Sequence, residues 1–429
     1  MSDHHIGCLI RRRIVHERSV RIIATAMIVL TLVAGCGEAE PTVTPVSKAP
    51  PPTATQTPIP PTAEPSPTAT PTVEPSPTVV AQETVASPSP AVADISAYIT
   101  DLASQDQFAG TVLVAQQGES IFKGAYGLAD RALDVPNQVD TKFNLGSIDK
   151  MFTAVAILQL VEQGKLSLDD KTVDILPEYA DTRIANQATV HQLLTHMSGM
   201  GDYLNSEYYK DIRLQIRSIA DYLPLFINTS PRFEPGAQFG YSNAGYIVLG
   251  LIVEKVTGQS YYDYVKENIF EPSGMISTAA YELDAETPNL AIGYTKLDAK
   301  GNETDKLTDN SFMMPMRGGS AGGGFSTVED LLKFGNALLD HQLLSPASTE
   351  LLLEGKVELG KDIQYAYGFF DHIWEVQRVV SHGGSFPGVC SYFGMYLDTG
   401  YILIVLSNTD EGCNPVLEFT RERLFDHQE

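Results

Sequence analysis

The sequence has few positive charges for its length. Its 429 residues include 29 lysines and arginines against 53 aspartates and glutamates, so the formal net charge at pH 7 is −24. A surface of this sign repels phosphate, and we therefore expect no nucleic acid partner. The hydrophobic share of 43% is nevertheless enough for a sizeable core, so most of the chain is expected to be globular.

Long apolar runs are also scarce. The uncharged stretch "IIATAMIVLTLVAGC", residues 22–36, follows several arginines and is short for a membrane span. A positive flank before a short apolar core is typical of an export signal. The run ends in Val33-Ala34-Gly35-Cys36, which resembles the lipobox of bacterial lipoproteins, whose cysteine is lipidated. We expect residues 1–36 to be a lipoprotein-type signal peptide, with a transmembrane anchor as the alternative.

Residues 37–93 contain almost no large apolar side chains and more than half of the 26 prolines. Such a segment cannot bury enough surface to fold, which predicts a disordered, Pro/Thr-rich linker. The predicted order is therefore a lipid anchor at Cys36, a tether, and a folded body over residues 94–429. This order places the body at the bacterial cell surface or on the periplasmic side, with the membrane as a partner through the lipid.

Cysteine is rare, with four residues in the chain. Cys8 lies in the predicted signal peptide and Cys36 is the predicted lipidation site. Cys390 and Cys413 remain, either as a disulfide or as two separate buried thiols. His196 is predicted to be structural, near the end of a short helix. Because the remaining histidines show no metal-ligand spacing, we predict no metal and no cofactor; they include His191, His341 and His372.

The body divides by the period of its apolar residues. A hairpin is predicted over 108–127, with its turn at Gln116-Gln117-Gly118. Predicted helices cover 94–105, 147–163, 191–196, 218–227, 243–257, 327–340 and 415–426, and predicted strands cover 365–370, 373–380, 389–397 and 401–408. Strands at both ends of the body predict an α+β fold. One antiparallel sheet, flanked by N- and C-terminal helices, would face an inserted helical region across a cleft.

A serine stands at the start of the first long central helix, with a lysine three residues later. Ser147 and Lys150 share one helix face, because residues i and i+3 are neighbours. The spacing places a nucleophile beside a candidate base. The helix start also offers an unpaired backbone N–H and a positive potential that favour an oxyanion. Because most such serines only cap a helix, the pair needs partners elsewhere.

Two later motifs supply these partners. Tyr241 and Asn243 precede an apolar helix, and His382-Gly383-Gly384 lies beside predicted strands. In this order, S-x-x-K, Y-x-N and H-x-G resemble the serine β-lactamase and penicillin-binding protein superfamily, in the branch of the class C β-lactamases, D-alanyl-D-alanine carboxypeptidases and esterases. Two further stretches are also similar to this family and extend the resemblance to nearly all of 94–427: "LLTHMSG", 193–199, and "AGGGFSTVEDLLKF", 321–334.

The resemblance implies a site and a mechanism. Ser147 would form an acyl-enzyme, with Lys150 and Tyr241 as alternative or cooperating bases. The backbone N–H groups of Ser147 and Ser385 would form the oxyanion hole. The implied substrate-binding residues are Asn243, His382, Gly384 and Ser385.

Departures from the family motifs bear on the substrate. Without an E-x-x-L-N stretch, the glutamate-dependent deacylation of class A β-lactamases has no candidate residue. H-G-G in place of K-T-G removes a cation and a hydroxyl that would help to hold a substrate carboxylate, because His382 is mostly neutral at pH 7. We predict a D-amino-acid peptidase or esterase for small-molecule or peptide substrates, including peptidoglycan-derived ones. The alternatives are a class C-type β-lactamase and a penicillin-binding sensor that acylates without turnover.

Overall fold

The computed structural model describes residues 89–179, 187–204, 206–298 and 300–425. The predicted signal peptide, the lipidation site Cys36 and the linker up to residue 88 lie outside these ranges. Among the described helices, none combines the length and the hydropathy that a membrane span requires.

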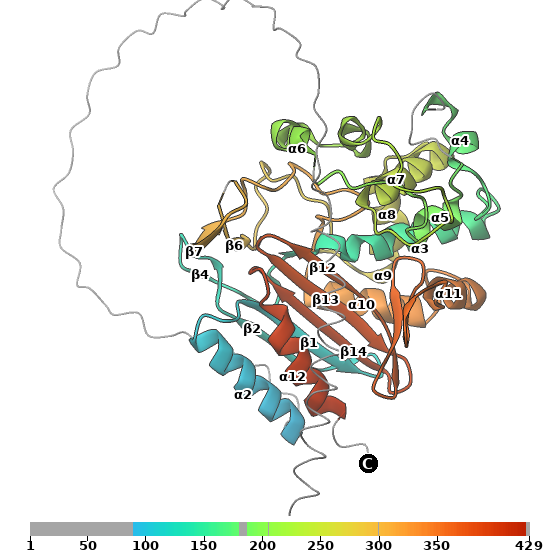
Figure 1. The fold of residues 1–429 in the computed structure, drawn as a ribbon. Coiled ribbons are helices and arrows are strands. Elements are labelled where there is room, and N and C mark those ends of the chain that lie inside the picture. Colours follow the sequence, from blue (N-terminus) through green and yellow to red (C-terminus); the bar gives the residue numbers. More distant parts are fainter. Residues whose placement is uncertain (1–88, 180–186, 205, 299, 426–429) are drawn as a thin grey trace, which may run out of the picture. The chain divides into compact units, whose positions relative to one another are not determined.

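The described chain is organised around one eight-stranded antiparallel sheet, in the order β2-β1-β14-β13-β12-β11-β10-β9 (Figure 1). The strands are β1 (Gly110–Gln116), β2 (Glu119–Tyr126), β9 (Val357–Gly360), β10 (Ile363–Tyr365), β11 (Phe370–Trp374), β12 (Gln377–Phe386), β13 (Val389–Tyr396) and β14 (Tyr401–Ser407). The first and last strands are neighbours, with Gly110 paired to Ser407. The sheet is therefore built from both ends of the body, as the sequence predicts.

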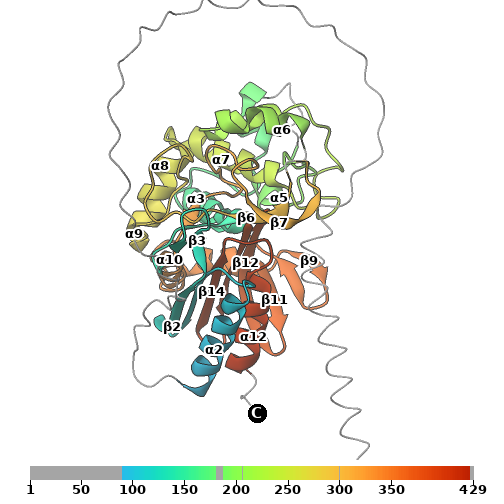
Figure 2. The ribbon, with the colours of Figure 1, turned by 90° about the vertical axis from the view of Figure 1, so that its left-hand side faces the viewer.

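Alternating side chains of the central strands enter two separate cores. On β1, Val112 and Val114 face one core, whereas Leu113 and Ala115 face the other. The first core is covered by α2 (Pro90–Ser104) and α12 (Cys413–Phe425), which lie together over one face of the sheet (Figures 1 and 2). The second core is closed by α10 (Val328–Leu339) and the helical region. Both faces are thus buried, as the apolar runs of these strands require.

The helical region is inserted between β2 and β9 and lies beyond one end of the long strands (Figure 1). Its helices are α3 (Asp149–Glu162), α4 (Thr172–Ile175), α5 (Val190–Leu194), α6 (Glu207–Ile212), α7 (Asn243–Thr257), α8 (Tyr261–Val265) and α9 (Glu271–Ser273), and α11 (Pro346–Leu353) follows α10. Three two-stranded sheets are also present: β3 (Leu128–Asp130) with β4 (Val135–Pro136), β5 (Phe143–Asn144) with β8 (Phe325–Ser326), and β6 (Tyr294–Leu297) with β7 (Glu303–Asp309).

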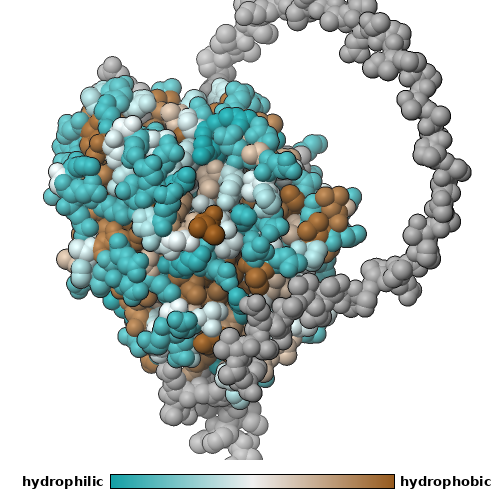
Figure 3. Space-filling view, turned by 180° about the vertical axis from the view of Figure 1, so that it is seen from behind, coloured by the Kyte–Doolittle hydropathy of each residue, from teal (hydrophilic) through white to brown (hydrophobic). Residues whose placement is uncertain are grey.

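The surface opposite to the view of Figure 1 is mainly hydrophilic, with hydrophobic residues in small separate patches (Figure 3). Large exposed apolar side chains of the described chain are Ile121, Leu133, Val135, Tyr208, Leu214, Ile276, Ile373 and Val376. Scattered residues of this kind are ordinary on a globular surface and do not by themselves mark a binding site.

Several predicted boundaries are wrong, for local reasons. The first helix starts at Pro90 rather than at residue 94, because proline is well suited to the first turn and Ser89 caps it. The predicted strand 373–380 is interrupted by a turn in which Glu375 has a positive φ of 55°. The predicted helix 218–227 is a 3₁₀ segment, Ile219–Leu225, with Pro224 inside it. The helix predicted over 243–257 is confirmed as α7.

Candidate active site

Ser147 lies in a 3₁₀ turn, Gly146–Ile148, immediately before α3. Gly146 has a φ of +52°, and a Cβ there would lie 2.9 Å from the Cα of Gly384, so glycine alone fits this approach to β12. No side-chain capping bond forms at the start of this turn or of α3. The serine is thus half-buried without acting as a helix cap, and its hydroxyl is left for other partners.

Lys150, one turn further along, is completely buried at 0% exposure. Its Nζ lies 3.1 Å from Ser147 Oγ, 2.7 Å from Asn243 Oδ1 and 2.5 Å from the carbonyl oxygen of Ala321. Burial lowers the pKa of Lys150 to about 7, although the carboxylates of Asp202 and Asp149 act in the opposite direction. A neutral amine is therefore accessible near neutral pH, beside a serine hydroxyl.

The glycine-rich segment after Ala321 holds that carbonyl in place. Gly322 and Gly323 have φ values of +154° and +95°, conformations that side chains disfavour. The N–H of Gly323 donates to the carbonyl of Gly146, and the N–H of Gly324 donates to the carboxylate of Asp149. The stretch "AGGGF" thus forms the wall behind the start of α3.

Tyr241 and Asn243 reach the same point from the start of α7. Ser242 is the cap of this helix, accepting from the N–H of Gly245, so Asn243 is free to contact Lys150. The Tyr241 ring lies 4.9 Å from Lys150 Nζ, measured to its centroid. Burial raises the pKa of Tyr241 above its usual range, and a hydrogen bond with the Ser147 side chain opposes this rise. The structure therefore brings the predicted residues Ser147, Lys150, Tyr241 and Asn243 together.

His382 occupies a different position from the one expected of a ligand-binding side chain. It lies within β12 and is 1% exposed, with its ring against Tyr241, Tyr365 and Phe370. Burial, and to a smaller extent the charge of Lys150, lower the pKa of His382 to about 3. The ring is therefore neutral and enclosed, which agrees with the expectation that H-G-G offers no cation to a substrate carboxylate; contact of His382 with a substrate stays a prediction. Sequence spacing places a residue on a strand but does not show how deeply it is packed.

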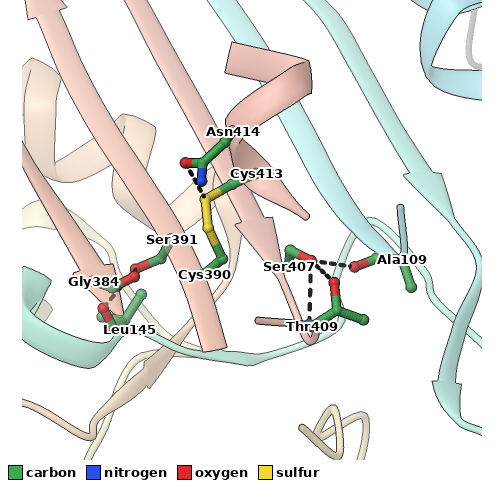
Figure 4. The surroundings of a disulfide bond; sticks show 9 residues. All are labelled: Ala109, Leu145, Gly384, Cys390, Ser391, Ser407, Thr409, Cys413 and Asn414. Carbon is green, nitrogen blue, oxygen red and sulfur yellow. Dashed lines mark hydrogen bonds between the residues drawn. A yellow bond between two sulfur atoms is a disulfide. The ribbon is translucent and has the colours of Figure 1, made fainter. Parts of the chain in front are cut away.

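Gly384 and Ser385 lie where β12 passes the serine turn. A Cβ on Gly384 would be 1.9 Å from the carbonyl oxygen of Leu145, so the third position of H-x-G must be glycine. Ser391, on the neighbouring β13, donates to that same carbonyl at 2.7 Å and lies 3.4 Å from the Gly384 carbonyl (Figure 4). Ser385 is exposed. The segments of the two predicted oxyanion donors, Ser147 and Ser385, are thus held in contact.

Sequence reasoning missed Asp202, which supports this site, and predicted only a structural role for His196. Asp202 accepts a hydrogen bond from Asn243 Nδ2 at 2.7 Å. His196 is fully buried, accepts the N–H of Ser242 on Nδ1 and contacts the Tyr365 hydroxyl through Nε2 at 3.0 Å. Of these two residues, the sequence pointed only to His196, which lies in the family-like stretch "LLTHMSG". In the described part of the chain, no group of three His, Cys, Asp or Glu side chains is arranged to hold a metal ion.

A model of the Beta-lactamase family matches residues 55–424. The chain belongs to the Beta-lactamase family. It is a serine hydrolase of the β-lactamase and penicillin-binding protein superfamily, with the α+β fold that the three motifs imply. The expected resemblance is therefore confirmed.

Relatives of this Beta-lactamase family member carry different names. Penicillin-binding protein 4* of Bacillus subtilis (strain 168) is 32% identical over 322 residues, which cover 72% of this chain and 70% of the relative. The crystal structure of a penicillin binding protein from Bacillus halodurans is 34% identical, with a TM-score of 0.68, and covers 76% of this chain and 99% of its own. The crystal structure of a D-amino acid amidase from Ochrobactrum anthropi SV3 is 25% identical, with a TM-score of 0.67. The match covers 79% of this chain and 99% of the amidase chain.

Proposed function

We propose that this hydrolase is exported and cleaves amide or ester bonds through an acyl-enzyme on Ser147. The observation that carries the proposal is the set of partners of Lys150. Two carbonyl oxygens, of Ala321 and of the Asn243 side chain, occupy two directions around Nζ, and the third is directed at Ser147 Oγ. In the neutral amine, the two N–H bonds point to the carbonyls and the lone pair points to the serine hydroxyl.

Acylation then follows as a balanced exchange. The Ser147 proton passes to Lys150 as Oγ forms a bond to the acyl carbon, and the carbonyl oxygen becomes an oxyanion facing the N–H groups of Ser147 and Ser385. The bond to the leaving amine or alcohol breaks as that group takes up the proton. The products of this step are the acyl-serine ester and the free amine or alcohol.

Tyr241 is proposed to carry the proton rather than to begin as a phenolate. Burial holds its pKa above its usual range, whereas the pKa of Lys150 is lowered to about 7. The phenol contacts Ser147, so it can donate to the leaving group and be reprotonated by Lys150. In deacylation, the same pair takes a proton from the attacking water.

The proposed substrates are D-amino-acid amides or peptides and neutral esters. Support comes from β12, where His382 is buried and neutral and Gly383 has no side chain, so this strand lacks both the cation and the hydroxyl with which K-T-G would hold a carboxylate. A D-amino acid amidase among the solved relatives agrees with this choice. Peptidoglycan-derived peptides belong to the same chemical class.

The location remains part of the proposal. The arginine-rich flank and the sequence ending in Cys36 support lipidation at that residue, which places the body outside the cytoplasmic membrane. Intact mass of membrane-extracted protein should show a diacylglyceryl group on a chain that starts at Cys36. An unprocessed N-terminus would contradict this proposal and favour the transmembrane alternative.

A side-by-side assay tests the substrate class. We would measure kcat/KM for D-phenylalanine amide, a D-alanyl-D-alanine peptide, an aryl acetate and a cephalosporin, in the native protein and in Ser147→Ala. The proposal expects the amide or the ester to exceed the cephalosporin, and all turnover to disappear in the variant. Preferred cephalosporin turnover would identify a β-lactamase, and a stable acyl adduct without turnover would identify a sensor.

A further inference from the structure

Asp202 lies behind the predicted catalytic group and is joined to it through Asn243. One carboxylate oxygen accepts from Asn243 Nδ2 at 2.7 Å, and the other accepts from the N–H of Leu204 at 3.0 Å. Asn243 Oδ1 in turn lies 2.7 Å from Lys150 Nζ. We propose that Asp202 is a positioning residue that sets the orientation of the Asn243 amide and thereby directs the Lys150 lone pair at Ser147. This inference rests on the proposed function and deepens it.

The orientation of the amide follows from the chemistry of its two neighbours. An ionised carboxylate only accepts hydrogen bonds, so Asp202 requires the NH₂ end of Asn243. The opposite orientation would place the amide oxygen against the carboxylate and the NH₂ group against the lysine nitrogen. Both contacts are unfavourable when Asp202 and Lys150 are charged, so the carboxylate selects one of the two amide orientations.

The selected orientation determines what Lys150 can do. With Oδ1 toward Nζ, Asn243 takes one amine N–H, the Ala321 carbonyl takes another, and the lone pair is left for the Ser147 hydroxyl. With the amide reversed, Nδ2 would donate to the amine lone pair. The lysine would then be unable to accept the serine proton, although every residue of the three motifs would still be present.

The Asp202 charge has a second effect on Lys150. The two aspartates and the aromatic and imidazole rings that face the buried amine are Asp149, Asp202, Tyr241, Tyr246, His196 and His382. Both histidines are neutral because burial lowers their pKa values, so the two aspartates are the acidic groups of this set, and burial raises the pKa of Asp149 to about 7. Burial raises the pKa of Asp202, and the hydrogen bonds from Leu204 and Asn243, with the charges of Lys150 and Arg232, oppose this rise. Removing the Asp202 charge should therefore lower the pKa of Lys150.

Two variants separate the two effects. Asp202→Asn keeps an acceptor oxygen and removes the charge, so the acidic limb of the acylation rate should move to lower pH with only a small loss of the maximal rate. Asp202→Leu also removes the acceptor, so the amide is free to reverse and the maximal rate should fall by roughly 10- to 100-fold. Asp340→Asn, an exposed acid at the end of α10, is the control for net charge and should leave both quantities unchanged.

A double-mutant cycle tests whether Asp202 acts through Asn243. In an Asn243→Ala background, Asp202→Leu should reduce the maximal rate of Ser147 labelling by a fluorophosphonate probe only slightly. An equal loss in both backgrounds would overturn the inference. So would an acylation rate whose acidic limb lies at the same pH in Asp202→Asn as in the native protein. A protein whose Ser147 takes no label contradicts the proposed function instead. In that case the Lys150 pKa, measured by ¹⁵N NMR titration in native protein and Asp202→Asn, still decides this inference.

Discussion

The imidazole of His196 packs against the phenol ring of Tyr241, with the ring centroids 4.1 Å apart and the ring planes tilted by 32°. Nδ1 of His196 accepts the N–H of Ser242, so Nε2 carries the proton and faces the Tyr365 hydroxyl. That hydroxyl lies 3.4 Å from Nε2 of His382, whose Nδ1 faces the Gly383 carbonyl at 2.6 Å. Each donor thus meets an acceptor when both imidazoles are neutral. This series of hydrogen bonds connects the Tyr241 turn to β12.

Replacing His196 should disturb Tyr241 without changing any residue of the three motifs. His196→Asn tolerates the positive φ of 58° but leaves the buried Ser242 N–H without its partner, which costs about 1–3 kcal/mol. We expect turnover to fall by roughly tenfold or more, together with the free energy of unfolding. The matched control is His341→Asn, at an exposed position with a φ of 57°. Equal effects of the two substitutions on turnover would reject the role of His196.

Stability should depend on pH through the buried His382. Its pKa is lowered to about 3 in the folded state, against about 6.5 in the unfolded chain, so between these values the unfolded state binds one more proton. The free energy of unfolding should therefore fall as the pH decreases from 6.5 toward 3, by about 1.4 kcal/mol per pH unit for this group. The free energy of unfolding would be measured by urea unfolding between pH 4 and 6. Its change per pH unit should be smaller by this amount in His382→Gln than in the native protein. An unchanged slope would show that His382 titrates normally.

Gly384 should not tolerate even a methyl group. In Gly384→Ala, the new Cβ would lie 1.9 Å from the Leu145 carbonyl, so β12 and the serine turn must separate and the two oxyanion donors with them. Loss of one such donor lowers rates by about 100- to 1000-fold, and we expect a loss of this size in kcat. Gly360→Ala, on the edge strand of the same sheet, meets its nearest atom at 3.6 Å and serves as the control. Near-normal kcat in Gly384→Ala would contradict the described contact.

The disulfide between Cys390 and Cys413 connects β13 to the start of α12 (Figure 4). It closes a loop of 23 residues, so its reduction should lower the free energy of unfolding by about 3 kcal/mol through the entropy of the unfolded chain. Chemical denaturation with and without reductant measures this difference. The double variant Cys390→Ser with Cys413→Ser should not respond to reductant. An identical midpoint for the native protein under both conditions would refute the prediction.

Much of the fold was predictable because it depends on local patterns. Uninterrupted apolar periodicity specified α7, and Gln117 and Gly118, both with positive φ, make the tight hairpin turn between β1 and β2. The joining of strands from both ends of the body into one antiparallel sheet followed from the placement of the predicted strands. The segment 363–380 was predicted less well, because alternating residues there are interrupted by a turn at Glu375 that carries no glycine, proline or asparagine.

The site was predictable where its residues lie close together in the sequence. Ser147 with Lys150 and Tyr241 with Asn243 are short patterns, and the structure brings them together. Asp202 and Ser391 act through single contacts with residues far away in the chain, so no spacing reveals them. The depth of His382 also depends on Tyr365 and Phe370 from other strands, which sequence patterns do not place.

The most direct test of the account is the covalent state of Ser147 during turnover. The protein would be mixed with an aryl ester or a D-amino-acid amide, quenched in acid, and analysed by intact mass and peptide mapping. The account predicts an added acyl mass on the peptide that contains Ser147, greatly reduced in Lys150→Ala and absent in Ser147→Ala. An acyl group on another residue, or undiminished turnover in Ser147→Ala, would contradict it.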